Sequence, residues 1–207
     1  MRPRSALLAL AAALLPRVAT ADAIGADPND PGRVTRVGKG VWEFDLGALG
    51  VMSVDRQGEM SSTRISTDAT VSIHRFLRDN VSAGVAAIVN YDSSGGGNTA
   101  ITYGAAAIGT LHLRLGLGAF LRPTLAVGAL IGNRELPVGM TTVEEATQLA
   151  GIARLALPIA YFTSRRFLLH AGPQLHLTAG TFTPAGGDAR SFTRISGGFG
   201  VGLGYVF

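Results

Sequence analysis

Eight charged side chains are the candidates for chemistry in this 207-residue sequence, because each lies in a segment where apolar and polar residues alternate. They are Glu43, Asp45, Arg64, Asp68, Arg114, Arg122, Arg154 and Arg194. Alternate residues of a β-strand share one face. If these segments are strands, all eight charges belong to the polar faces, and the chemistry available to them is mutual ion pairing or the attraction of small ions.

Glu43 and Asp45 form the acidic pair with the most informative spacing. Two residues apart on one strand, their side chains lie about 7 Å from each other and repel unless a cation lies between them. Arg114 and Arg122 flank a short predicted turn, and we expect them to face this pair from the opposite side of the fold. Such a network could be a gate that small ions or a force open, or a static plug. Buried charges need partners, which favours the plug.

The four histidines fall on the same polar faces as these charges. His170 and His176 share one predicted strand, but six residues separate them by about 20 Å, too far to bind one metal ion. A catalytic set of Ser, His and acid cannot be assembled from the sequence. We therefore predict no catalytic residues, no metal site and no cofactor.

The elements that must position these residues are predicted from period-two patterning after Gly40. The pattern is clearest at the end of the chain, where one face carries the residues Phe199, Val201, Leu203, Tyr205 and Phe207 and the other carries glycines. Seven further segments alternate in the same way, and each reaches the ~9–11 residues of a tilted membrane-spanning strand. The eight segments are 42–53, 64–74, 81–91, 101–114, 121–131, 148–161, 167–178 and 194–207.

The connections between these segments alternate in length. Those at 77–80, 115–118 and 163–166 are short, whereas those at 55–62, 92–99, 133–146 and 182–190 are longer. This parity is typical of an up-and-down barrel with tight periplasmic turns and longer external loops. It is not expected of a soluble sandwich. Trp42, Tyr161 and Tyr205 then lie near the periplasmic ends, at the level of lipid headgroups.

Composition and the N-terminal segment bear on location. Although 47% of the residues are hydrophobic, no apolar run reaches the roughly 18 residues of a membrane-spanning helix. Residues 1–23 have the basic start, short apolar stretch and small-residue end of a signal peptide, cleaved after Ala21 or Ala23. Cleavage removes three Arg and one Asp, so the isoelectric point of about 10.1 does not indicate nucleic acid binding. Residues 24–39 are predicted to be a flexible periplasmic lead-in, and residues 40–207 the barrel.

Two stretches of the sequence resemble a known family, the eight-stranded outer-membrane β-barrels of Gram-negative bacteria of the OmpA and OmpX type. They are the last strand, Phe199–Phe207, and the strand, turn and strand at Phe76–Gly84. The resemblance implies an all-β, antiparallel transmembrane barrel in the outer membrane. It implies contact with lipid and lipopolysaccharide, and delivery by periplasmic chaperones to the barrel-assembly machinery, which reads the alternating apolar residues of the last strand. Cell-wall anchoring through a peptidoglycan-binding domain, as in OmpA, is not expected of this chain.

We predict a non-enzymatic outer-membrane barrel that contributes to envelope structure or surface interaction. Eight strands enclose an interior just wide enough for side chains to fill, and the charges would plug it. An alternative is a narrow channel, or a binder or transporter of small hydrophobic molecules, because the Gly, Ala and Thr residues of the inward face could leave voids. A lipid-modifying enzyme of the outer membrane is a further alternative. Such an enzyme needs a His and a Ser toward lipid or at the outer rim, and we expect every His to face inward.

Overall fold

The computed structural model describes residues 24–27, 29–57, 60–94, 99–116, 118–138 and 142–207. The predicted signal peptide, residues 1–23, lies outside the described part. No helix in the described ranges is long and apolar enough to cross a membrane.

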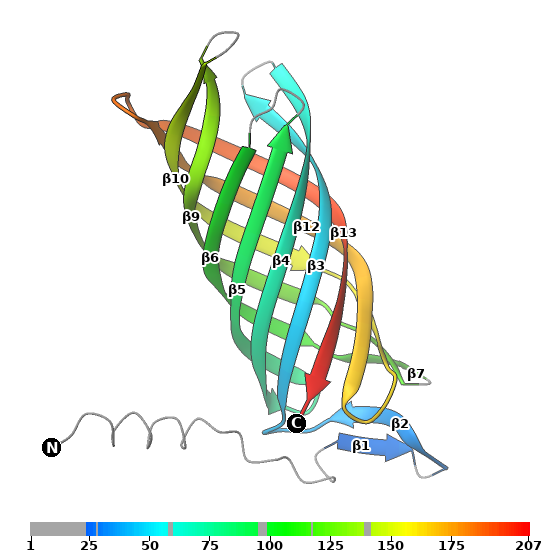
Figure 1. Cartoon of the computed structure of the whole chain (residues 1–207). Helices are drawn as coiled ribbons and strands as arrows, with labels where there is room; N and C mark the ends of the chain where they lie inside the picture. The colour runs from blue at the N-terminus through cyan, green and yellow to red at the C-terminus, as the bar shows by residue number, and fades with distance from the viewer. Residues whose placement is uncertain (1–23, 28, 58–59, 95–98, 117, 139–141) are drawn as a thin grey trace, which may run out of the picture.

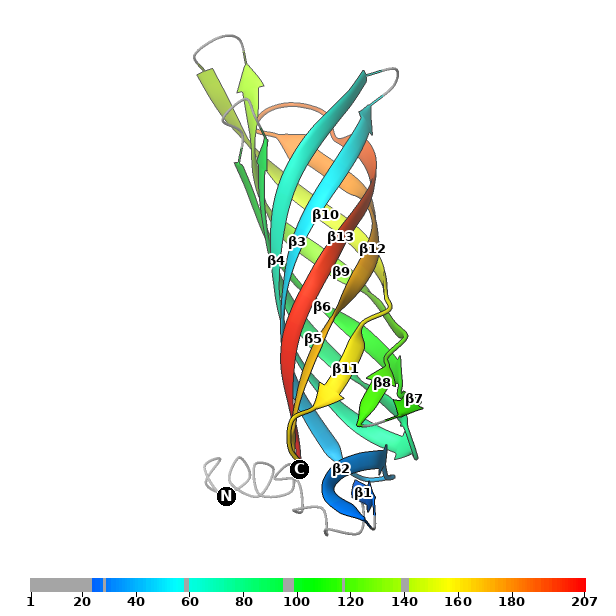
Figure 2. The ribbon, with the colours of Figure 1, turned by 90° about the vertical axis from the view of Figure 1, so that its right-hand side faces the viewer.

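Eight long antiparallel strands form a closed barrel (Figures 1 and 2). They are β3 (Trp42–Gln57), β4 (Met60–Arg78), β5 (Val81–Ser94), β6 (Thr99–Leu111), β9 (Thr124–Val138), β10 (Thr142–Ala156), β12 (Phe167–Pro184) and β13 (Arg190–Val206). Each strand pairs with the next in this order, and pairing of β13 with β3 closes the ring. The eight-stranded up-and-down barrel predicted from the alternation is thereby confirmed for the described residues.

Three short strands continue the wall at one end: β7 (Leu113–Gly116), β8 (Ala119–Leu121) and β11 (Ile159–Phe162). Prolines account for two of the three interruptions, because a proline has no N–H to donate to its neighbour. Pro123 separates β8 from β9, and Pro158 separates β10 from β11. Their carbonyls still accept hydrogen bonds, from Leu111 N at 3.0 Å and from Arg122 N at 2.8 Å respectively. At each of these two breaks the proline pair therefore keeps one of the two backbone hydrogen bonds that a pair of residues usually exchanges.

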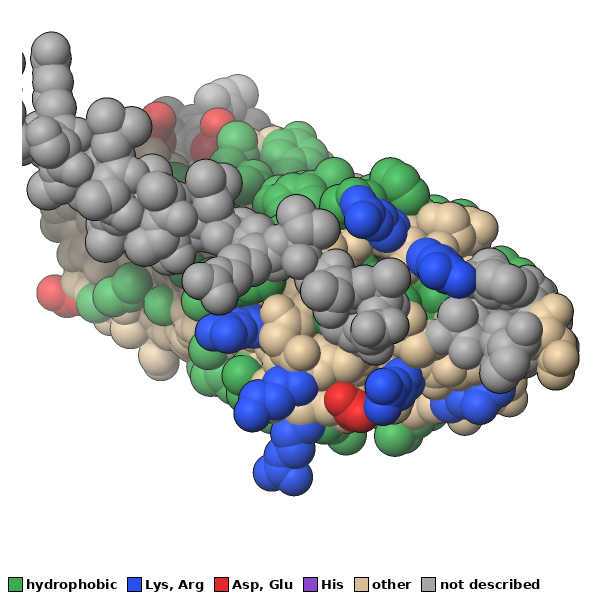
Figure 3. Space-filling model, turned by 90° about the horizontal axis from the view of Figure 1, so that it is seen from below, with side chains coloured by type: hydrophobic (Ala, Val, Ile, Leu, Met, Phe, Trp, Pro, Cys, Tyr) green, Lys and Arg blue, Asp and Glu red, His purple; other side chains and the backbone are tan. Residues whose placement is uncertain are grey.

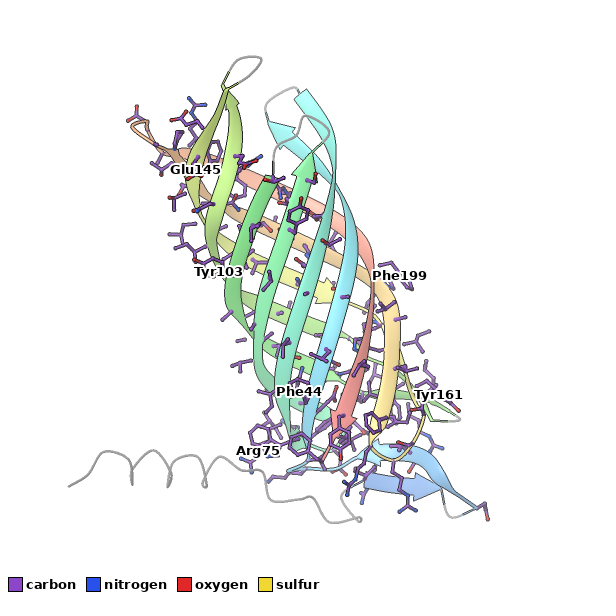
Figure 4. All side chains as sticks on the ribbon, viewed as in Figure 1. Phe44, Arg75, Tyr103, Glu145, Tyr161 and Phe199 are labelled. Atoms are coloured by element: carbon purple, nitrogen blue, oxygen red, sulfur yellow. The ribbon has the colours of Figure 1, made fainter. Side chains whose placement is uncertain are left out.

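Side chains alternate between the interior and the outer surface along each long strand, as the burial pattern of β6 illustrates. Large apolar side chains on the outer surface are about half exposed, including Tyr103, Tyr161 and Phe199, which point away from the barrel in Figure 4. The interior instead holds small, polar and charged side chains together with a few larger apolar ones. The barrel therefore has an apolar outside and a largely polar inside.

The segment before the barrel differs from the expected flexible lead-in. Residues 24–37 form a hairpin of β1 (Ile24–Asp27) and β2 (Asp30–Val37), placed beneath the end of the barrel in Figures 1 and 2. The hairpin is attached through the turn between β4 and β5: Val37 N donates to Asn80 Oδ1 at 3.0 Å, and Asn80 N donates to Val37 O at 2.8 Å.

Apolar packing explains why this hairpin is ordered. Val34 and Val37 are fully buried in one cluster with Phe76 and Phe120 from the barrel. This segment contains two prolines and its apolar alternation is short, so the period-two pattern does not predict strands here. The lower end of the barrel is thus covered by apolar side chains that lie outside the eight predicted strands.

The same end of the barrel is basic. Figure 3 views this end and shows Lys and Arg side chains gathered around it. The exposed cations near this end, on the turns, the short strands and the last residues of β4, are Arg36, Lys39, Arg75, Arg78, Arg114, Arg165 and Arg166. Arg75 stacks over the ring of Trp42, with 5.6 Å between the guanidinium carbon and the ring centroid. Aromatic and basic side chains therefore meet at one rim.

Candidate functional site

Arg122 joins the two acidic side chains nearest the lower end of the barrel interior. Its Nη1 donates to Asp45 Oδ2 at 3.3 Å, and its Nη2 donates to Glu43. Arg122 precedes β9, which lies opposite β3 in the ring, so the ion pairs cross the lumen. Glu43 is fully buried, and only 3% of the Arg122 side chain is exposed. One guanidinium thus bridges two like charges that would otherwise repel.

Histidines surround this lower cluster. His170 Nε2 lies 2.8 Å from Asp45 Oδ2, and His112 Nε2 lies 3.5 Å from Glu43 Oε2. His74 is also buried, with its Nε2 at 2.8 Å from Ser72 Oγ. The expected inward position of the histidines is therefore observed. No group of His and acidic residues in the described ranges has the geometry to hold a metal ion.

A second cluster lies higher in the lumen, between β4 and β10. Arg154 pairs with Asp68 and donates to Thr70 Oγ1 at 3.0 Å. Asp68 also accepts a hydrogen bond from Asn90 Nδ2 at 2.6 Å, and His176 Nδ1 lies 3.6 Å from it. Because β4 and β10 lie on opposite sides of the ring, this cluster also crosses the lumen. Ion pairs therefore cross the interior at two levels.

Arg194 pairs with Asp92, a residue that the sequence analysis did not include. Asp92 continues the inward row of Asn90 on β5, which extends to Ser94 rather than ending at Tyr91. The period-two pattern continues through Asp92, but the polar residues of the segment 92–99 favour a loop. The strand therefore reaches further than its apolar residues indicated.

One of the predicted lumen cations, Arg114, is not part of these clusters. Arg114 is exposed on β7, and the expectation that it faces Glu43 and Asp45 is not met. The reason is that β7 stands at the end of the sheet order, paired with β8, and a register shift follows Arg114. Its side chain thus lies beyond the closed ring. Arg64 lies on β4, and its side chain is outside the described part of the structure.

A small cavity of about 70 Å³ lies between the lower and upper clusters. Residues from all eight long strands line it, with Arg122 and Asp45 at one end and Arg154 at the other. Its two sides differ in chemistry. The side formed by β5, β6, β9 and β10 carries Ala86, Ile88, Ile108, Ala126 and Ala156, whereas the side formed by β3, β4 and β12 carries Gly47, Thr70, Ser72, His74, His170 and Gln174.

The residues of the last strand that are predicted to form the assembly signal lie on the outer surface. Phe199, Val201 and Leu203 are exposed, and Tyr205 and Phe207 are partly exposed. The terminal residue also contributes to closure, because Phe207 N donates to Trp42 O and Trp42 N donates to Phe207 O, each at 2.8 Å.

These features define the fold as a small eight-stranded antiparallel β-barrel. The crystal structure of Neisserial surface protein A, NspA, is similar, with a TM-score of 0.51 at 12% identity over 83% of this chain and 98% of that one. The N-terminal β-barrel domain of Pseudomonas aeruginosa OprF aligns over 82% of this chain and 99% of that domain, with a TM-score of 0.44 and 18% identity. No protein-family model matches the sequence, and no curated protein matches it.

Proposed function

We propose that this chain is a non-enzymatic integral barrel of the bacterial outer membrane, which contributes to envelope structure or surface interaction. The observation that carries the proposal is the exposed apolar surface. Val127, Leu149 and Ile195 are 56%, 58% and 59% exposed, and similar side chains occur on every long strand. Apolar surface of this extent is unfavourable in water and favourable in lipid. Export through a cleaved signal peptide is part of the proposal.

The ion pairs across the lumen support a structural role rather than conduction of ions. Arg122 and Arg154 each form ion pairs across the interior, at two different levels. An ion that crosses the barrel would have to separate both sets of pairs. The covering of the lower end by Val34 and Val37 of the N-terminal segment adds a third obstruction.

Planar-bilayer recording tests the closed lumen. We expect the purified, refolded protein to be silent at neutral pH, because buried ion pairs separate only at a large cost in free energy. A heat-denatured sample serves as the negative control, and a porin as the positive one. Stepwise conductance of the native protein would contradict the plug and favour the narrow channel.

The partners expected of such a barrel are lipid, lipopolysaccharide, periplasmic chaperones and the barrel-assembly machinery. Lipid contact is supported by the rim where Arg75 stacks over Trp42, since aromatic and basic side chains favour the level of the headgroups. A lipid-modifying activity is not favoured, because His74, His112 and His176 are buried on the lumen side of the wall.

The role of the last residue in assembly is tested by Phe207→Ser. The substitution removes the aromatic ring but retains both backbone hydrogen bonds with Trp42. We expect lower amounts in the outer membrane and periplasmic degradation, whereas Phe207→Tyr should accumulate normally. Immunoblots of fractionated cells measure the effect, and refolding in detergent shows whether both variants can form the barrel. Normal outer-membrane amounts of the Ser variant would mean that the ring is not read during assembly.

A further inference from the structure

The outer face of β4 changes from apolar to basic in one step at the lower end of the barrel. Val71 and Ile73 face outward and are 44% and 37% exposed, and the next outward residue is Arg75. On the neighbouring strand β3, Phe44 pairs with Ile73 and Trp42 pairs with Arg75. Figure 4 shows Phe44 and Arg75 on the outside of this end. In a membrane such a step coincides with the boundary between lipid chains and head groups, because a basic side chain is costly beside the chains.

Four cations gather around the turn between β4 and β5. Arg75 and Arg78 belong to the end of β4. Arg36 and Lys39 come from the N-terminal segment, which Asp79 of the turn binds with both carboxylate oxygens. Arg36 Nη1 donates to Oδ2, and the backbone N of Lys39 donates to Oδ1, each at 3.2 Å. We call these four cations and Asp79 the basic corner.

Backbone hydrogen bonds and one ring fix the geometry of the basic corner. Gly40 N donates to Phe76 O at 2.8 Å, so the neighbours of these two residues, Lys39 and Arg75, are held close together. The guanidinium of Arg75 lies over the ring of Trp42, with 5.6 Å from its carbon to the ring centroid. The ring occupies one face of the guanidinium, and the N–H groups at its edge stay available to an oxygen acceptor.

The basic corner has an excess of positive charge. Its four cations are exposed, and with one carboxylate they leave a net charge of +3. No carboxylate of the described residues forms an ion pair with the side chains of Lys39, Arg75 or Arg78. Like charges at close range repel, and an anion between them lowers that repulsion. The corner therefore favours an anionic ligand.

The opposite end of the barrel has the reverse charge. Among the described residues of that end, four carboxylates are at least partly exposed: Glu135, Glu144, Glu145 and Asp188. The exposed cation described there is Arg190. Figure 4 shows Glu145 and Arg75 at opposite ends. The attraction of anions is therefore a property of one end, not of the whole surface.

We propose that the basic corner binds an anionic phospholipid of the phosphatidylglycerol class. Its phosphate lies beside Lys39, Arg75 and Arg78, and one acyl chain follows Ile73 and Phe44 along the outer surface. The phosphate supplies the oxygen acceptors and the compensating charge, whereas the ammonium group of a zwitterionic lipid would be repelled by the corner. The proposal rests on the membrane location proposed above and goes beyond it, because it specifies the lipid and the place where it binds.

The fluorescence of Trp42 provides the test, because the chain has one Trp and it lies at the proposed site. The protein is refolded into phosphatidylcholine vesicles that contain either phosphatidylglycerol or phosphatidylcholine with bromine on the acyl chains near the head group. Bromine quenches a neighbouring Trp, so titration of each brominated lipid gives its relative association constant. We expect a preference for phosphatidylglycerol of roughly ten-fold or more, since each Lys or Arg near an anionic lipid contributes about five-fold.

The two ways in which this result could fail are distinguishable. Equal quenching by the two brominated lipids would overturn the lipid site and leave the membrane location intact. Quenching by neither lipid, in a sample whose gel mobility changes on heating, would overturn both.

A pair of matched double variants localises the site. Lys39→Gln with Arg78→Gln removes two cations of the corner but leaves the contact between Arg75 and Trp42, so the fluorescent reporter is retained. The control, Arg114→Gln with Arg190→Gln, removes the same charge elsewhere: Arg114 lies on β7, away from the lower end of β4 in Figure 1, and Arg190 at the opposite end. We expect the first variant to lose most of the preference and the control to retain it. An equal loss in both would indicate diffuse attraction and overturn the corner.

Inorganic phosphate distinguishes a bound lipid from a bound free anion. Added phosphate should lower the preference no more than sodium chloride of equal ionic strength, because screening is then its only effect. If phosphate abolishes the preference where chloride does not, the corner is a site for a free anion and the assignment to lipid is wrong.

Discussion

Replacement of Arg122 by Met is expected to destabilise the barrel by about 3–5 kcal/mol, the usual cost of removing one partner from a buried ion pair. The effect is large because Arg122 compensates both Glu43 and Asp45, which are buried and two residues apart. Without the guanidinium, two like charges remain in a confined interior. The measurement is urea unfolding of the protein refolded into lipid vesicles, at neutral pH.

Arg114→Met is the matched control for this prediction. Both arginines flank the same short turn, but Arg114 is exposed and should change the free energy of unfolding by less than about 0.5 kcal/mol, as surface substitutions usually do. Adding Glu43→Gln and Asp45→Asn to Arg122→Met should restore much of the lost stability. If Arg122→Met and Arg114→Met cost the same, or if the added substitutions give no rescue, the assignment of these ion pairs is wrong.

Val127→Arg is expected to destabilise the barrel by about 2–4 kcal/mol, the cost of a basic residue facing lipid near the bilayer midplane. Val127 is 56% exposed and lies near the middle of the strand that β8 and β9 form together. Ala126→Ser changes the adjacent residue, which faces the lumen, and should cost much less. Unfolding in vesicles compares the two. A larger cost for Ala126→Ser would mean that the inner and outer faces have been exchanged.

Gly128 shows what alternation cannot predict. It lies on the inward face of β9, where the pattern alone suggests that a small polar residue such as Ser would be tolerated. A Cβ at this position would lie 2.1 Å from the carbonyl oxygen of Ala105. Alternation reports the face on which a side chain lies, but not how closely the neighbouring strand approaches it.

The number of strands, their order and their two faces could be predicted because each follows from local alternation and loop length. The partners across the lumen could not, since they depend on the register of strands that are distant in sequence. Asp68, for example, pairs with Arg154 on the far wall. Alternation places Arg114 in the lumen because it does not reveal where the closed ring ends.

Hydrophobic alternation also does not predict short apolar segments or the ends of strands. Val34 and Val37 form the hydrophobic contacts of the N-terminal hairpin, yet they lie in a segment with two prolines and little alternation. Asp92 belongs to β5, but polar residues at a strand end resemble a loop. In both cases tertiary contacts, rather than local preference, determine the structure.

The most direct test of the membrane-spanning barrel is the electrophoretic mobility of heated and unheated samples from fractionated cells. We expect the protein to be recovered in the outer-membrane fraction and its mobility to change on heating, because a closed barrel resists detergent until its strands separate. Recovery in the soluble periplasm, with the same mobility before and after heating, would contradict it.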